Sequence, residues 1–231
     1  MEKHINISIC IPAFNEQKSL EEAVEDLMKT LVPCVRELDI IIVDDGSSDS
    51  TPQVAEQLVK KYHQVRVIHH LKKMGIGSCY RDALALAGGD YFTWFPGDHE
   101  NSADEFILCM PYLKNDTVVT CYHLGQDPRS YLRHFLSRSY TWLLNKFYRL
   151  NLKYYNGLTV FPTAVLRSLH LVADGFLFTA ENLIKAIRRG YKIVELLAPL
   201  RGRLCGKSNA LTVSSVVQIT KDTFKLIMSR K

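Results

Sequence analysis

Apolar runs alternate with amphipathic stretches along the first part of the chain. Four runs have the length and composition of buried strands: Ile5–Ile11, Leu38–Val43, Val65–His69 and Tyr91–Phe95. Between them, apolar residues recur at helical spacing, as in Leu20, Val24, Leu27 and Leu31. Strands that alternate with helices predict an α/β fold, with a mostly parallel central sheet covered by helices on both faces.

The second part of the chain is less regular. Tyr131–Leu150 reads as a helix whose apolar face includes Leu143, with Asn145 and the basic residues on the other side. Further expected elements are a strand at Leu158–Phe161, a helix at Ala180–Arg189, a strand at Lys192–Leu197 and a helix at about Leu211–Met228.

Length and composition suit a single ordinary domain. The 231 residues are 47% hydrophobic, enough for one globular domain with a full core. The six cysteines contain no C-x-x-C pair, which favours reduced core thiols in a cytosolic protein. Neither a signal peptide nor an apolar run of the roughly 20 residues needed to span a bilayer is evident. We therefore expect a cytoplasmic protein, soluble or peripheral to a membrane.

Charge is unevenly distributed. The net charge is +5, but the segment from Pro128 to Ala173 lacks Asp and Glu. Its seven basic residues are Arg129, Arg133, Arg138, Lys146, Arg149, Lys153 and Arg167. This asymmetry predicts an anionic partner for the basic helical region 129–150, and the alternative is a solvated helix face.

Polar residues follow the ends of the predicted strands, where α/β proteins bind ligands. Asp44 and Asp45 could bind a nucleotide or simply form a turn with Gly46. Asp98 and Glu100 could share one hard cation or could mark a helix N-terminus. G-x-G-x-x-G and P-loop motifs are both missing, which disfavours dinucleotide-binding Rossmann and P-loop proteins.

Three segments together resemble family-2 glycosyltransferases: IPAFNE, IIVDDGSSDST and KKMGIGSCYRDALALAGGDYFTWFPGD. The resemblance implies a GT-A fold, a UDP- or GDP-sugar donor and Mg²⁺ or Mn²⁺. It makes residues 1–110 the nucleotide-sugar-binding half and residues 111–231 the acceptor half of one domain. The donor-binding residues that it implies are Pro12, Phe14, Glu16, Asp44, Asp45, Gly75 and Gly77. Among these, Asp44 would contact the base.

The chain departs from the family at the D-x-D motif. Asp98 falls on its second acidic position, whereas the first is Pro96, which cannot ligate a metal through its side chain. We expect Asp98, Glu100 and the donor phosphates to hold the metal. The alternative is weaker metal dependence, or none.

The second half is similar, more loosely, to polyprenyl-phosphate sugar transferases of the dolichol-phosphate mannose synthase kind. Four segments carry this likeness: Arg133-x-x-x-Ser137-Arg138, Asn156-Gly157, GFLFTAENLIKAIRRGYKIVEL and Arg203-x-x-Gly206-Lys207-Ser208. The likeness implies that Arg133, Ser137 and Arg138 receive a lipid phosphate. It also implies that Arg203 and Lys207 close over the diphosphate, although Asn209 replaces the usual lysine after Ser208.

The leading interpretation is an inverting glycosyltransferase with a polyprenyl-phosphate acceptor, peripheral on the cytoplasmic face of an anionic membrane. An anionic acceptor needs no strong base, whereas a sugar hydroxyl would need one, and Glu181 is then the candidate. A third possibility is a non-catalytic nucleotide-sugar-binding subunit. We expect no nucleic-acid partner, and a membrane-protein partner is left open.

Overall fold

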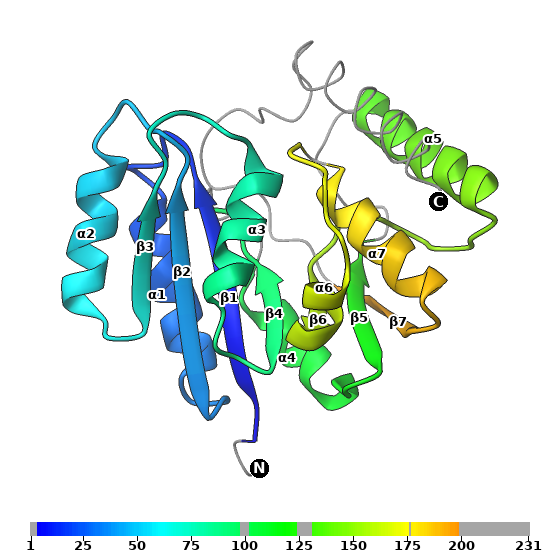
Figure 1. Ribbon diagram of the computed structural model, residues 1–231, viewed down its shortest axis with the longest axis horizontal. Coiled ribbons are helices and arrows are strands. Elements are labelled where there is room, and N and C mark those ends of the chain that lie inside the picture. Colours follow the sequence, from blue (N-terminus) through cyan, green and yellow to red (C-terminus); the bar gives the residue numbers. More distant parts are fainter. Residues whose placement is uncertain (1–3, 98–101, 124–130, 176, 199–231) are drawn as a thin grey trace.

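The computed structural model describes residues 4–97, 102–123, 131–175 and 177–198 (Figure 1). These residues form a seven-stranded sheet in the order β3-β2-β1-β4-β6-β5-β7. The strands are β1 (Asn6–Ala13), β2 (Glu37–Asp44), β3 (Val65–His69), β4 (Tyr91–Trp94), β5 (Thr117–Tyr122), β6 (Thr159–Pro162) and β7 (Lys192–Leu197). The helices are α1 (Leu20–Leu31), α2 (Thr51–Lys61), α3 (Ile76–Leu86), α4 (Asp104–Cys109), α5 (Tyr131–Tyr148), α6 (Thr163–Ser168) and α7 (Phe178–Arg188), with a short 3-10 helix at Met110–Tyr112.

The sheet is mostly parallel, as predicted. Strands β1 to β4 run parallel, and β6 is antiparallel to both of its neighbours, β4 and β5. Since β7 is parallel to β5, every strand except β6 ends at the same edge of the sheet. This edge is the upper one in Figure 1, and we call it the carboxyl edge.

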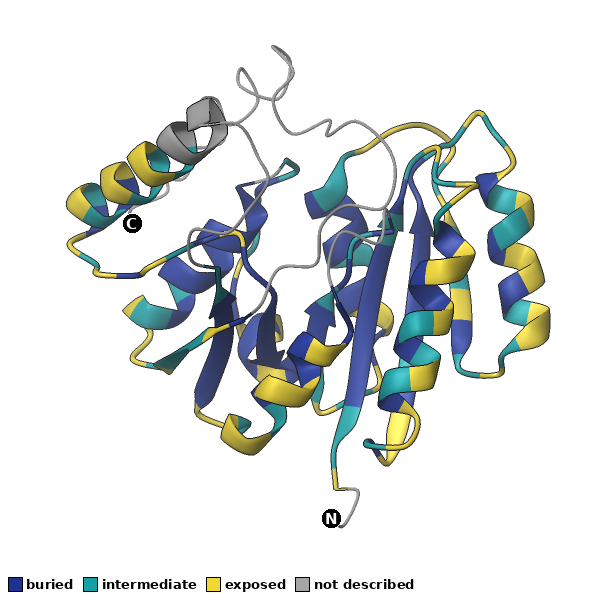
Figure 2. Cartoon of the chain, turned by 180° about the vertical axis from the view of Figure 1, so that it is seen from behind, coloured by how far each residue is buried: buried dark blue, intermediate teal, exposed yellow. Residues whose placement is uncertain are grey.

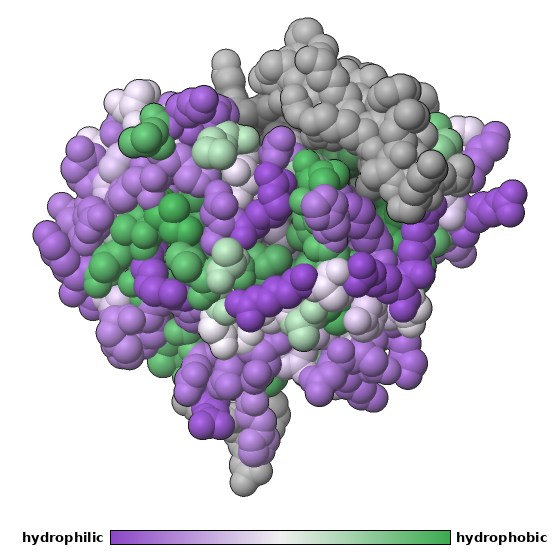
Figure 3. All heavy atoms as spheres, in the orientation of Figure 1, coloured by the Kyte–Doolittle hydropathy of each residue, from purple (hydrophilic) through white to green (hydrophobic). Residues whose placement is uncertain are grey.

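Two apolar layers enclose the sheet, which accounts for the buried strands in Figure 2. Helices α1, α2 and α4 cover one face, and α3, α6, α7 and part of α5 cover the other. The four predicted α1 positions from Leu20 to Leu31 are all fully buried. Burying one such side chain stabilises the fold by about 1.5–3 kcal/mol. The outer face seen in Figure 3 is mainly hydrophilic, with apolar surface between the polar side chains.

Most predicted elements are present with shifted ends. The strand at Val65–His69 and the strand at Lys192–Leu197 match in full, whereas β5 and α6 were not expected. Gly77 lies inside the first turn of α3, not in the loop before it. The helix expected at 211–228 lies outside the described residues.

The predicted apolar face of α5 is confirmed in part, because Tyr140, Phe147 and Leu150 pack against the core whereas Leu143 does not. Leu143 is 52% exposed, whereas its neighbour Leu144 is 1% exposed and packs in the core. Asn145, expected to face outward, is half-buried and bonds both backbone groups of Leu152 as well as the hydroxyl of Tyr155. The buried face is therefore wider than predicted on the side of Leu144 and Tyr148, and the chain after the helix packs against Asn145.

Candidate functional site

Strand register brings the predicted donor residues together at the carboxyl edge. Ala13 pairs with Asp44, and Asp44 pairs with His69, so three parallel strands end side by side. Asp44 and Asp45 are only 3% and 4% exposed. Because a buried carboxylate needs hydrogen-bond donors, the partners of these two residues define the site.

Asp45 anchors the segment that leads into α3. One carboxylate oxygen accepts from the backbone N–H of Met74 at 2.7 Å and lies 2.9 Å from His70 Nδ1. The other oxygen accepts from the N–H of Gly75 at 2.9 Å. The Asp45 carboxylate thereby holds residues 70–75 against the end of the sheet.

Asp44 binds its own turn and a neighbouring histidine. Its carboxylate accepts from the N–H of Ser47 at 3.1 Å and lies 3.1 Å from His69 Nδ1. Burial opposes the charged imidazole, but hydrogen bonds to Asp44 and Glu56 raise the pKa of His69 above its usual value. The Asp44 carboxylate therefore lies between its own turn and the His69 ring.

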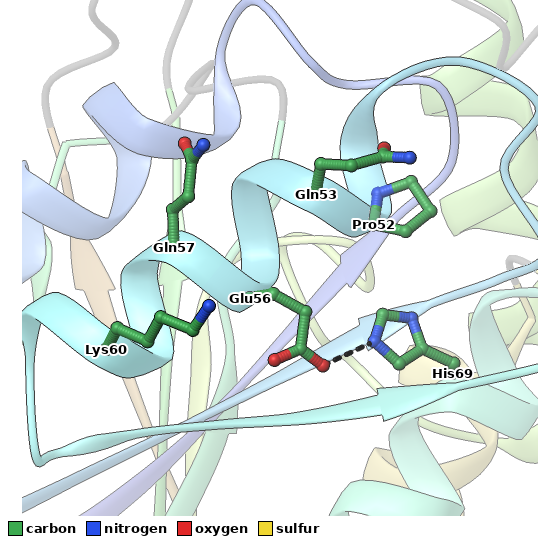
Figure 4. Close-up of a pocket in the computed structure, with 6 residues that line it drawn as sticks. All are labelled: Pro52, Gln53, Glu56, Gln57, Lys60 and His69. Atoms are coloured by element: carbon green, nitrogen blue, oxygen red, sulfur yellow. Dashed lines mark hydrogen bonds and ion pairs between the residues drawn. The ribbon is translucent and has the colours of Figure 1, made fainter.

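A pocket of about 420 Å³ lies beside this histidine (Figure 4). It is lined by residues of α2 and by His69, and the Glu56 carboxylate points at the His69 ring. None of the predicted donor residues lines it. The pocket flanks the carboxyl edge instead of forming the donor site.

The segment after β1 forms the opposite wall. Lys73 Nζ lies 3.6 Å from the centre of the Phe14 ring, a cation–π contact. Asn15 has a positive φ of 58° and bonds the Ser47–Ser48 turn. The N–H of Glu16 donates to the Thr51 hydroxyl at 2.8 Å. Phe14 and Glu16 thus lie in a hydrogen-bonded frame that includes the turn after β2.

Pro12 and the end of β4 meet closely. A Cβ added to Gly97 would lie 3.1 Å from the Pro12 carbonyl oxygen. The residue after Gly97 is Asp98, so the chain reaches the predicted metal ligand directly from this contact. Asp98, Glu100, Arg203 and Lys207 themselves lie outside the described residues.

Gly75 and Gly77 join the two halves of the molecule. Gly75 has a φ of +100°, and a Cβ added to Gly77 would lie 2.1 Å from the Ala173 carbonyl oxygen. The N–H of Gly77 donates to the Asp174 carbonyl at 2.8 Å, and Arg81 bonds the Ala173 carbonyl and the Asp174 carboxylate. Both positions therefore require glycine, because a side chain at either one would collide with the backbone of residues 173–174. The sequence motif alone does not reveal this requirement.

Glu181 is buried and already hydrogen-bonded, unlike a solvent-accessible catalytic base. It is 1% exposed, and its carboxylate accepts from the N–H groups of Val172 and Ala173 at 2.9–3.1 Å. Lys185 Nζ also lies 2.6 Å away. These contacts make Glu181 a support for the segment that meets Gly77, and its role as a base stays a prediction.

The predicted acceptor residues lie on α5. Ser137 is half-buried and Arg138 is exposed, whereas the side chain of Arg133 lies outside the described part of the chain. Trp142 is 60% exposed, with Lys146 Nζ 4.9 Å from its ring centre. The described part of α5 thus presents basic and aromatic side chains together.

Three residues of the site were not predicted: His69, His70 and Lys73. His69 ends β3 and His70 follows it, just as Asp44 ends β2 and Asp45 follows it, so the strand-end rule could have found the histidines. Lys73 had no such signal, because its contact with Phe14 depends on how the 70–75 segment folds back.

Comparison with known proteins places the chain in a family. The model of glycosyl transferase family 2 matches residues 8–175. Glycosyltransferase AglD of Haloferax volcanii is 24% identical over 203 residues, which cover 83% of this chain and 32% of that protein. Chondroitin synthase of Escherichia coli is 28% identical over 136 residues, which cover 59% of this chain and 19% of that protein. The chain therefore spans less than half the length of these curated relatives.

A solved structure has the same fold. Glucosyl-3-phosphoglycerate synthase from Mycobacterium tuberculosis, in complex with Mn²⁺, UDP and phosphoglyceric acid, superposes with a TM-score of 0.73 at 19% identity. The superposition covers 96% of this chain and 79% of that one. The predicted GT-A fold is thereby confirmed. Together with the match over residues 8–175, this shows that the chain belongs to glycosyl transferase family 2.

Proposed function

We propose that this protein transfers a sugar from a nucleotide-diphosphate sugar, with a UDP-sugar as the first donor to test. The observation that carries the proposal is the carboxyl edge, where buried Asp44 and Asp45 lie beside Phe14 and Lys73. Family membership supports this interpretation, as does a structural neighbour bound to UDP.

The described residues suit the parts of such a donor. The Asp44 carboxylate can accept an N–H from the base, as the family resemblance implies, in addition to its bond from Ser47. The Phe14 ring offers an apolar face, and Lys73 supplies a positive charge next to it for a phosphate oxygen. Asp45 acts indirectly, because it positions the segment that carries Lys73.

A divalent metal is the cofactor that we propose, with Asp98 and Glu100 as its protein ligands. Hard cations such as Mg²⁺ and Mn²⁺ take oxygen ligands, and such an ion would neutralise the leaving diphosphate. Related structures contain Mn²⁺ or Mg²⁺.

For the acceptor we propose a lipid phosphate at an anionic membrane surface. Arg138, Lys146 and Arg149 are exposed on or just after α5, beside exposed Trp142 and Leu143. Cationic and aromatic side chains on one helix suit phosphate headgroups and the membrane interface. No helix in the described part of the chain has the length and apolarity to cross a bilayer.

A sugar hydroxyl is the second candidate acceptor. The names of matched proteins include a chondroitin synthase and a glucosyl-3-phosphoglycerate synthase, so the family does not single out one acceptor. A hydroxyl acceptor needs a base, and the carboxylate of Glu181 is occupied by two backbone N–H groups and Lys185. This observation favours an acceptor that is already anionic.

Donor binding is tested by thermal shift with UDP- and GDP-sugars, with and without Mn²⁺. A bound donor raises the melting temperature by mass action, and we expect UDP-sugars with Mn²⁺ to give the largest rise. Asp98→Asn should remove the metal-dependent part of that rise while leaving the melting temperature of the free protein unchanged. No shift with any donor would contradict the proposed nucleotide-sugar site, and a shift without any sugar transfer would indicate the non-catalytic nucleotide-sugar-binding alternative.

Acceptor binding is tested with anionic liposomes. We expect salt-sensitive binding that falls when Arg133 and Arg138 are both changed to Ala, with donor-induced thermal shifts retained. Absence of liposome binding, with full activity on a soluble sugar, would overturn the lipid-phosphate proposal.

A further inference from the structure

A second group of possible metal ligands lies behind the donor site. Asp45 follows β2, His70 follows β3, and Cys79 lies in α3, which crosses over these two strands. One ligand atom from each residue lies within 4.8 Å of the other two. The three residues are almost fully enclosed: Cys79 is 0% and Asp45 4% exposed, and the His70 side chain is 6% exposed.

We propose that Asp45, His70 and Cys79 form a binding site for a borderline-soft divalent ion such as Zn²⁺. Carboxylate, imidazole and thiolate together are ligands that Zn²⁺ accepts, whereas Mg²⁺ and Mn²⁺ prefer oxygen alone. A tetrahedral ion about 2.0–2.3 Å from each ligand keeps the ligand atoms roughly 3.3–3.8 Å apart. Binding therefore requires His70 Nδ1 and the Asp45 carboxylate oxygen, 2.9 Å apart in the metal-free protein, to separate slightly.

The surroundings of the histidine support this assignment. His70 Nδ1 faces Asp45, while Nε2 lies 3.1 Å from a carboxylate oxygen of Asp82. A metal-bound histidine commonly donates its other ring N–H to a carboxylate, which fixes the orientation of the ring. Asp82 already occupies that outer position, three residues after Cys79 on the same helix.

The carboxylate ligand is also held in place. Backbone N–H groups of Met74 and Gly75 bond both oxygens of Asp45. Burial and the nearby Asp45 raise the pKa of the Cys79 thiol, so this thiol is protonated in the metal-free protein. The ion must therefore displace the thiol proton to solvent, while the imidazole keeps a proton on Nε2 toward Asp82.

This site differs from the donor metal site in both place and chemistry. The donor ion is expected at Asp98 and Glu100, which follow β4, and would bind oxygen only. An ion at Asp45 would instead lock the 70–75 segment, which carries Lys73, to α3 through Cys79. Zn²⁺ would thus hold the 70–75 segment in one conformation without contacting the nucleotide sugar.

Co²⁺ is the probe for this site, because a cobalt–thiolate bond gives an intense near-ultraviolet band. We expect the intact protein to develop this band on Co²⁺ addition, and Zn²⁺ to abolish it by competition, with excess Mg²⁺ having no effect. Cys79→Ser should remove the band. Cys109→Ser and Cys34→Ser, which change a buried and a half-buried thiol elsewhere, should retain it.

Asp82→Asn gives a second test that spares all three ligands. We expect the apparent affinity for Co²⁺ to fall by about tenfold or more, because the outer partner of His70 is weakened. Affinity should also fall as the pH is lowered, since binding releases the thiol proton. A band that persists in Cys79→Ser, or no thiolate band at saturating Co²⁺, would overturn the proposal whether or not a nucleotide sugar binds.

Discussion

The two halves of the molecule place their charged residues in opposite ways. In the donor half, Asp44 and Asp45 are buried and bonded to backbone N–H groups and histidines. In the acceptor half, Arg138 and Lys146 are exposed on α5, and Arg149 follows directly after it. A buried charge needs a partner for each polar atom, whereas an exposed charge is solvated without one.

The difference in burial indicates what kind of ligand each surface can bind. The donor site is a single hydrogen-bonded unit, so its geometry is set before a ligand arrives. The basic surface of α5 carries separate side chains, which suits an extended anionic partner better than one small ligand. The halves meet where the first turn of α3 contacts Ala173 and Asp174, a segment supported by Glu181.

Breaking that junction should have the largest effect. Gly77→Ala places a Cβ against the Ala173 carbonyl, so we expect a loss of about 3 kcal/mol in unfolding free energy. For a chain of this size, this loss lowers the melting temperature by roughly 6–12 °C. Gly88→Ala is the matched control, since nothing lies within 4 Å of its added Cβ. Equal melting temperatures for the two variants would contradict the close approach.

A buried acid of the donor half, away from the donor site, sharpens the comparison. Glu105 of α4 is 1% exposed, and neither of its oxygens has a hydrogen-bond partner among the described residues. His123 Nε2 lies 3.9 Å from one of these oxygens and carries a charge only when the imidazole is protonated. Burial raises the pKa of Glu105 to about 7. Glu105 thus lacks the backbone N–H donors that stabilise Asp44 and Asp45.

The raised pKa gives stability a defined pH dependence. The folded state holds the Glu105 proton more tightly than the unfolded state does. The stabilising contribution of this protonated acid is therefore fully present below about pH 4.5 and is lost as the pH rises through about 7. Glu105→Gln should therefore stabilise the protein at pH 8 by up to roughly 3 kcal/mol, with little effect at pH 4.5. Urea unfolding at both pH values measures this, with the exposed-site variant Glu37→Gln as control. A pH-independent difference would refute the buried-acid assignment.

Glu181→Gln tests whether the acceptor half contains a carboxylate that is held by backbone N–H groups, as Asp44 and Asp45 are. Loss of charge weakens the bonds from Val172 and Ala173 and the ion pair with Lys185, so we expect about 2 kcal/mol of destabilisation. Turnover per folded molecule should be retained. If turnover is lost while the melting temperature is unchanged, Glu181 acts as a base instead.

The smallest effect concerns the exposed surface of α5. Trp142→Ala should leave stability within about 0.5 kcal/mol of the parent. It should weaken binding to anionic liposomes by about 1 kcal/mol, roughly fivefold in the partition coefficient. Tyr112→Ala, which removes an exposed aromatic ring outside the basic region, is the control. Equal liposome binding by both variants would exclude Trp142 from the contact.

The sequence was informative where local periodicity and burial agree. Apolar runs predicted β1 to β4, and helical spacing predicted the buried face of α1. Asp44 and Asp45 could be placed at the edge of the sheet because parallel strands end together. The face of α5 was predicted only in part, because the helical spacing does not show that the turn after the helix binds Asn145 and leaves Leu143 exposed.

By itself, then, the sequence determined the fold class, the family and the strand ends that carry the donor site, since each depends on nearby residues. Only the tertiary structure decided that Gly77 bridges the halves, that Lys73 covers Phe14, and that the Glu181 carboxylate is occupied by backbone N–H groups. The first two features depend on distances between segments far apart in the chain, and the third depends on how the irregular segment before α7 folds back onto the helix. Such contacts produce no periodic pattern in the sequence from which they could be predicted.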